Sequence, residues 1–150
     1  MIPKEKLNLF ASYLPILSID LLVRYNNKFL LVRRNNYPAK NKFCFVGGII
    51  QKGEKIKGGM KRILKRELNI TADNFKFLTY KQFDFPKDFS NLRTKVSYLS
   101  LCHEISLNKS QILKIKTNCE NKKIVYLSKK ELILKKDVLN QVKGLIKDIY

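Results

Sequence analysis

The segment from Gly47 to Ile70 constrains the fold of this chain more than any other stretch. It reads GGIIQKGEKIKGGMKRILKRELNI: a glycine pair, a loop with Glu54, and then apolar residues at positions 56, 60, 63, 64 and 68. Apolar residues at these offsets form one stripe along an α-helix, so we predict a helix over Ile56–Leu68. Glu67 lies at the edge of the stripe, from where its carboxylate can point back to the loop. A loop beside a helix-borne carboxylate is a candidate cation site.

The rest of the chain predicts short strands around this helix. Strands are expected at Ile16–Val23, Lys28–Arg33, Phe43–Val46, Phe75–Phe83, Lys95–Ile105 and Lys123–Leu127. The first two are joined through Asn26 and Asn27, a hairpin signal. Further helices are expected at 4–13, after the capping-box pair Ser128 and Glu131, and at Asp137–Ile149. Asn69 is expected to end the central helix in the left-handed conformation. This order favours an α+β sandwich over a doubly wound sheet.

Length and composition fit a globular protein. The chain has 150 residues, and we expect residues 1–150 to form a single domain. No apolar run approaches the roughly 20 residues that cross a bilayer. The N-terminal segment carries an apolar stretch, but Pro15 and Asp20 interrupt it and no cleavage site follows. We therefore expect it to belong to the fold, and we expect a cytoplasmic protein without membrane contact.

The net charge of +19 is the unusual value in the composition. It favours a polyanionic partner, either nucleic acid or a phosphate-rich ligand. No RNA-binding motif accompanies the lysines, so a basic solvated surface is an equally good interpretation and nucleic acid is not favoured. The cysteines Cys44, Cys102 and Cys119 form no CxxC pair, and His103 is the one histidine. A structural zinc site is therefore not expected, and the thiols are expected to be buried or inert.

The spacing of the central segment resembles the signature of the Nudix hydrolases. That signature consists of a Gly, a Glu, an Arg-Glu pair, a Glu-Glu pair and a Gly, and here Gly48, Glu54, Arg62 and Glu67 match it. The resemblance implies an α/β/α sandwich with a mixed central sheet. Three positions depart from the signature: Ile63 and Arg66 stand where it has Glu, and Asn69 stands where it has Gly.

These departures resemble one subgroup, the GDP-mannose mannosyl hydrolases, which have an apolar residue after the Arg and keep the last Glu of the pair. The subgroup resemblance implies hydrolysis of GDP-mannose to GDP and mannose by water attack at the anomeric carbon. Such a reaction needs a good leaving group, which one Mg²⁺ (or Mn²⁺) on the diphosphate would provide.

The resemblance also assigns roles to individual residues. The metal ligands would be the carbonyl of Gly47 and the carboxylates of Glu67 and Glu120, oxygen donors that suit Mg²⁺. Arg34 would bind the diphosphate, since a guanidinium matches phosphate oxygens. Tyr98 would donate to the leaving phosphate, and Asp20 has either a substrate contact or a structural role. The expected catalytic set comprises Glu67 and Glu120, together with Arg62 and Glu54, which would brace the loop through an ion pair.

Two further positions differ from the subgroup. Asn121 stands where the subgroup has a His general base, which leaves Glu120 as a candidate base. Ile49 stands where an Arg would contact the diphosphate. Two alternatives therefore remain open: a phosphoanhydride-cleaving Nudix pyrophosphatase, and a catalytically weak Nudix-fold protein that binds nucleotide or RNA. The resemblance also implies a homodimer in which the N-terminal segment reaches the partner's site.

Overall fold

The structure is a computed structural model that describes residues 3–37, 39–86, 95–116 and 121–150. Five helices and seven strands follow one another in these ranges. Their order is α1 Lys4–Tyr13, β1 Ile16–Tyr25, β2 Lys28–Arg34, β3 Phe43–Cys44, β4 Val46–Ile49, α2 Ile56–Leu68, β5 Lys76–Phe85, β6 Val96–Ser106, α3 Lys109–Leu113, β7 Asn121–Leu127, α4 Lys129–Leu134 and α5 Asn140–Ile149.

The strands form one mixed sheet with the order β3-β2-β1-β6-β5, in which β4 also pairs with β1 and β7 with β2. The pair β1 and β6 is parallel, and the other pairs are antiparallel. The β1–β2 hairpin turns at Asn26 and Asn27, both at positive φ, as the sequence predicts. Along β1 the antiparallel partner changes: β2 pairs with Val23–Tyr25, whereas β4 pairs with Ser18–Leu21.

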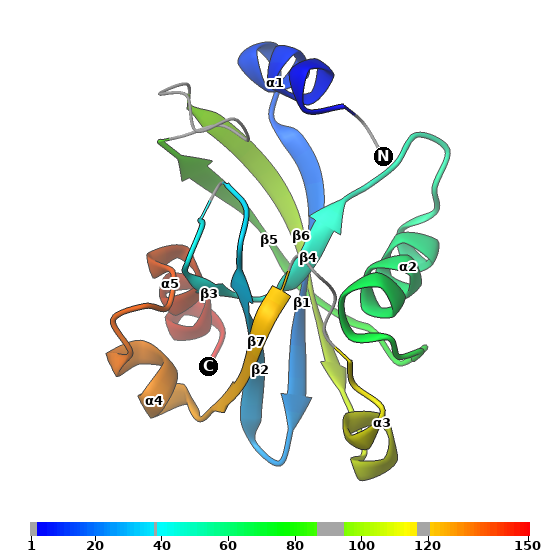
Figure 1. Ribbon diagram of the computed structural model, residues 1–150, viewed down its shortest axis with the longest axis vertical. Coiled ribbons are helices and arrows are strands. Elements are labelled where there is room, and N and C mark those ends of the chain that lie inside the picture. Colours follow the sequence, from blue (N-terminus) through cyan, green and yellow to red (C-terminus); the bar gives the residue numbers. More distant parts are fainter. Residues whose placement is uncertain (1–2, 38, 87–94, 117–120) are drawn as a thin grey trace.

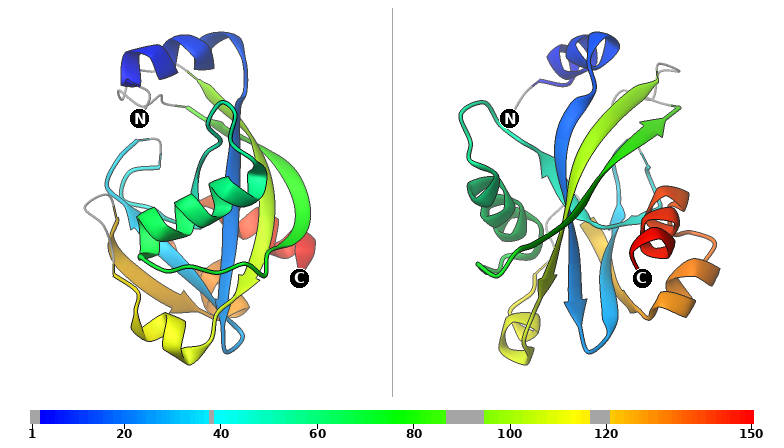
Figure 2. Two further views of the ribbon diagram at one scale, coloured as in Figure 1. Left: turned by 90° about the vertical axis from the view of Figure 1, so that its right-hand side faces the viewer. Right: turned by 180° about the vertical axis from the view of Figure 1, so that it is seen from behind.

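Helices cover both faces of the sheet. Figure 1 shows α2 on one side and α4 with α5 on the other, and the views in Figure 2 agree. The core is divided accordingly. Alternate β1 residues such as Leu21 pack with Ile63 and Leu64 of α2, while Leu22 packs with Leu145 of α5. The α/β/α sandwich expected from the resemblance is therefore confirmed.

The central helix has the predicted bounds. Its apolar stripe is buried, and the chain leaves it through Asn69 at φ 57°, in the left-handed conformation. The capping box at Ser128 is also confirmed, since Ser128 accepts from the Glu131 amide and Glu131 accepts from the Ser128 amide. Because the apolar side of α2 packs against the sheet, Glu67 is held at a fixed place beside β4.

Two sequence predictions were incomplete. The strand expected at Phe43–Val46 is divided, because β3 pairs with β2 whereas β4 pairs with β1. The short helix α3 was not predicted. Asn108 caps it, but it buries no side chain and has no apolar stripe that would reveal it.

The described cysteines and the histidine are buried. Cys44 and Cys102 are buried free thiols, while Cys119 lies outside the described residues. His103 is buried in β6, where its ring packs edge-on against Phe77. None of the helices in the described part of the chain has the length and apolar content that a bilayer span requires.

Candidate functional site

A cavity of about 150 Å³ opens beside the point where β1 changes partner. Strands β1 to β6 contribute to its wall, as do α2 and α5. Five residues proposed from the sequence line it: Asp20, Arg34, Gly47, Glu67 and Tyr98. The fold thus brings together residues from four strands and one helix that are far apart in the chain.

Asp20 lines the cavity and accepts a hydrogen bond from the buried Ser100 behind it. The Ser100 hydroxyl donates to Oδ2 of Asp20 at 2.6 Å. Desolvation by burial raises the pKa of Asp20 above its ordinary value of 3.8, while the Ser100 hydrogen bond and the charge of Arg34 act in the opposite direction. The neutral form of this carboxyl is therefore favoured more than in water.

Gly47 allows β4 to approach Asp20 closely. A Cβ at this position would lie 2.5 Å from Oδ1 of Asp20 and 2.8 Å from the carbonyl oxygen of Ile19. Neither neighbour is the end of a flexible chain, since Asp20 is held by Ser100 and Ile19 by the sheet. Glycine is thus required at this position of the cavity wall by space.

Arg34 and Tyr98 supply hydrogen-bond donors to the cavity. The neighbouring Arg33 points elsewhere, where it donates to the Asn41 carbonyl and lies over the Phe43 ring. Burial raises the pKa of Tyr98, so its hydroxyl keeps its proton at neutral pH and can donate.

Cys44 also lines the cavity, but burial raises its pKa to about 12. It is a thiol at neutral pH, which excludes a thiolate nucleophile at this position.

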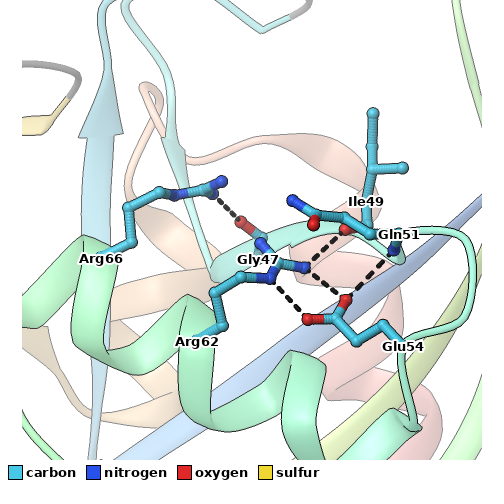
Figure 3. Close-up of polar contacts among 6 residues, drawn as sticks. All are labelled: Gly47, Ile49, Gln51, Glu54, Arg62 and Arg66. Carbon is cyan, nitrogen blue, oxygen red and sulfur yellow. Dashed lines mark hydrogen bonds and ion pairs between the residues drawn. The ribbon is translucent and has the colours of Figure 1, made fainter. Parts of the chain in front are cut away.

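Glu54 and Arg62 lie outside the cavity wall and brace the loop between β4 and α2. Nε and Nη2 of Arg62 donate to the two carboxylate oxygens of Glu54 at 2.6 and 2.7 Å. Nη2 also donates to the Ile49 carbonyl at 3.0 Å, and Glu54 accepts from the Gln51 amide at 3.1 Å, as Figure 3 shows. The ion pair expected from the sequence is present. It fixes the end of β4 to the helix that carries Glu67.

A third arginine connects Glu67 with Gly47. The Arg66 Nε and Nη2 both contact Oε1 of Glu67, at 2.7 and 2.6 Å. Nη2 also donates to the Gly47 carbonyl at 3.2 Å, a contact drawn in Figure 3. The two oxygen atoms expected to bind a metal therefore already face one cationic group. Their chemistry fits a hard divalent cation, which prefers carboxylate and carbonyl oxygens.

The remaining expected ligand, Glu120, lies outside the described residues. Within the described ranges, no group of three or more His, Cys, Asp or Glu side chains gathers in the manner of a metal centre. Besides protein oxygens such as those of Gly47 and Glu67, Mg²⁺ commonly takes water and ligand phosphate oxygens.

Sequence reasoning missed two residues of the site, Ser100 and Arg66. Ser100 could have been found, because it is two residues after Tyr98 in a predicted strand and so shares its face. The role of Arg66 was hidden, since adjacent residues on a helix do not usually face each other.

Comparison with known proteins decides the family. The NUDIX domain model matches residues 15–148. The chain belongs to the Nudix family. This Nudix chain is 26% identical over 108 residues to the low-salt glycan biosynthesis protein Agl8 of Haloferax volcanii, a match that covers 71% of this chain and 69% of Agl8.

Two other similarities extend the comparison. An ADP-ribose pyrophosphatase of Methanocaldococcus jannaschii is 32% identical over 71 residues, 47% of this Nudix chain and 42% of that protein. Among solved structures, the MutT protein of Methanosarcina mazei Go1 superposes with a TM-score of 0.75 at 17% identity, covering 91% of this chain and 94% of that one. The last similarity concerns the fold alone.

Proposed function

We propose that this Nudix chain hydrolyses a nucleoside diphosphate sugar by water attack at the anomeric carbon, with GDP-mannose as the first candidate substrate. The observation that carries the proposal is the small number of acidic side chains that line the cavity. Among its described lining residues, the acidic side chains are Asp20 and Glu67, and burial disfavours the ionised form of Asp20. Two carboxyl groups, of which burial disfavours the ionised form of one, suit a reaction that depends on leaving-group stabilisation more than on several metal ions.

The other lining residues support the same proposal. Arg34 can bind a diphosphate in a fork, and Tyr98 can donate to the leaving phosphate. A divalent cation, Mg²⁺ or Mn²⁺, would be held by the Gly47 carbonyl and Glu67 and would neutralise charge on the leaving diphosphate. Glu120 remains the predicted third ligand and candidate base. Arg62 and Glu54 act as positioning residues that fix Glu67 against β4.

The names of the two relatives favour cleavage of different bonds in the substrate. Agl8, named for glycan biosynthesis, is consistent with a sugar nucleotide. The ADP-ribose pyrophosphatase favours a second candidate, cleavage of a phosphoanhydride in a nucleotide substrate. Hydrolysis of GDP-mannose and of ADP-ribose in ¹⁸O-water separates the two. Label in the sugar indicates attack at carbon, and label in a phosphate indicates attack at phosphorus and would overturn the first proposal.

Turnover itself is tested by GDP release in the presence of Mg²⁺. We expect Glu67→Gln to lower kcat at least about a hundredfold, because one electrostatic contact in a transition state contributes on that order. Glu131→Gln is the matched control, since Gln also completes a capping box and Glu131 lies on α4, outside the cavity wall. If the wild-type chain releases GDP no faster than Glu67→Gln and binds RNA in a salt-sensitive manner, the binding-protein alternative suggested by the +19 charge holds instead.

We further propose that residues 1–150 form one Nudix domain that works as a homodimer through α1. Four apolar side chains at the end of α1 and just after it are each more than half exposed: Leu9, Phe10, Tyr13 and Leu14. Figure 1 shows α1 beyond one end of the sheet, away from the α2 and α5 layers. An apolar group of this kind favours burial against another protein surface.

A further inference from the structure

Arg66 joins the two oxygen donors that the proposed function assigns to a divalent cation. Its guanidinium contacts Oε1 of Glu67 twice, at 2.6 and 2.7 Å, and donates to the Gly47 carbonyl at 3.2 Å. A metal ion bound to both oxygens would need the same space. The guanidinium and the cation therefore exclude each other from this position.

The local structure is built to hold the guanidinium there. Gly48 lies beside it, and a Cβ at that position would be 3.0 Å from Nη2 of Arg66 and 3.2 Å from Ile63. The Glu67 side chain is 5% exposed, so a partner for its charge matters strongly for stability. In the absence of metal, Arg66 supplies that partner.

The same arginine is able to leave. Its side chain is 35% exposed, and it lines the cavity together with Arg34. A guanidinium displaced from Glu67 would thus remain at the cavity wall, where a second fork for phosphate oxygens is useful. Withdrawal does not require the helix to move, since the long side chain carries the charge.

We propose that Arg66 is a built-in competitor for the divalent cation: it occupies the Gly47–Glu67 position until the metal binds, and then turns to the diphosphate. The inference rests on the proposed function for the identity of the two ligands. It predicts weak metal binding by the free protein, and metal binding that is strengthened when a diphosphate is present to accept the displaced guanidinium.

Mn²⁺ titration without nucleotide, followed by the electron paramagnetic resonance of free Mn²⁺, tests the competition. We expect Arg66→Met to bind Mn²⁺ at least about tenfold more tightly than the wild type, because the competing charge at contact distance is gone. Lys65→Met removes the same charge from the preceding, exposed helix position and should change the affinity less than about threefold. Equal effects of the two variants, or no tightening by Arg66→Met, would overturn the proposal.

A second measurement uses the wild-type chain and so does not depend on the stability of a variant. The Nε–H signal of Arg66 in a nitrogen–proton correlation spectrum should change its chemical shift and broaden on saturation with Mg²⁺, because the Nε–H exchanges faster with water once its hydrogen bond to Glu67 breaks. A signal that stays unchanged at saturation contradicts the competition. Neither readout involves turnover, so a chain without hydrolase activity still answers this question, and an active one with unchanged Mn²⁺ affinity in Arg66→Met refutes only the competition.

Discussion

Arg62 and Glu54 form a two-pronged ion pair across the junction of loop and helix, with N–O distances of 2.6 and 2.7 Å. Both side chains are partly buried, so the ion pair should contribute more to stability than a fully exposed ion pair would. We expect Glu54→Gln to lower the free energy of unfolding by about 1–3 kcal/mol at pH 7, as loss of a charged hydrogen-bond partner does. Urea unfolding measures the loss, and Arg62→Met alone should cost a similar amount.

The stability lost in Glu54→Gln should depend on pH in a definite direction. The hydrogen bond from Arg62 holds the pKa of Glu54 below its ordinary value of 4.5. The unfolded chain therefore takes up the proton first as the pH falls, and the contribution of Glu54 is full above 4.5 and is lost below it. Free energies of unfolding of the wild type and Glu54→Gln that converge as the pH falls below 4.5 agree with this prediction. A difference between them that stays constant with pH contradicts it.

Asp20 should show the opposite dependence. Because burial raises its pKa above 3.8, the folded chain binds this proton more tightly than the unfolded one. Its favourable contribution is complete below 3.8 and is lost as the pH rises through the folded value. Asp20→Asn should therefore gain stability relative to wild type as the pH rises, while binding of the substrate weakens.

Ser100→Ala sharpens the test of Asp20. Removing the hydroxyl that donates to Asp20 takes away a contact that lowers the pKa of Asp20 in the folded chain. The gain of Asp20→Asn should still begin near the unfolded value of 3.8, but the pH at which the gain levels off should move upward. Ser18→Ala is the matched control, because Ser18 lines the cavity near Asp20 and is not among the groups that shift the pKa of Asp20; it should leave that pH unchanged. If the difference in free energy of unfolding between Asp20→Asn and the wild type does not change with pH, the raised pKa of Asp20 is contradicted.

The two glycines Gly47 and Gly144 should respond to alanine with opposite signs. At Gly47 the new methyl group meets Asp20 and the Ile19 backbone, so strand β4 must shift; we expect a loss of about 1–3 kcal/mol. At Gly144, within α5, it meets nothing within 4 Å, and we expect a gain of about 0.5–1 kcal/mol from helix propensity. Thermal unfolding of both variants measures the two changes in stability. A loss of stability in Gly144→Ala would contradict the prediction.

The α1 surface is tested by one charged substitution. If α1 forms the dimer, Leu9→Glu should shift the protein to a monomer at micromolar concentration in equilibrium sedimentation. Leu134→Glu, at a comparably exposed leucine on α4, should leave the assembly unchanged. A wild-type chain that sediments as a monomer contradicts the proposal directly.

Local chemistry explains how much of the fold the sequence predicted. The hairpin at Asn26 and Asn27, the end of α2 at Asn69 and the capping box at Ser128 each depend on residues within a few positions of one another. Such features can be predicted from a single segment. The boundaries of α2 were predictable for the same reason, because its stripe is periodic over the whole helix.

Partners far apart in the chain explain what the sequence did not predict. The break between Cys44 and Val46 exists because β3 and β4 pair with different strands. The contact of Ser100 with Asp20 follows from the parallel pairing of β1 with β6, which no local pattern encodes. Arg66 departs from the family signature, and only the reach of its side chain to Gly47 gives that departure a physical meaning.

The pairing of β1 with β6 has a consequence for the order of folding. Its strands hold Asp20 and Ser100, which are 80 residues apart, so forming this ladder closes a long loop and carries a large entropic cost. The contact between Glu54 and Arg62 closes a loop of only 8 residues and can form early. A nascent chain can therefore assemble the brace of its central helix while the cavity still lacks one wall. Protection of the β6 amides from hydrogen exchange would then mark the moment at which the chain gains a place for its ligand.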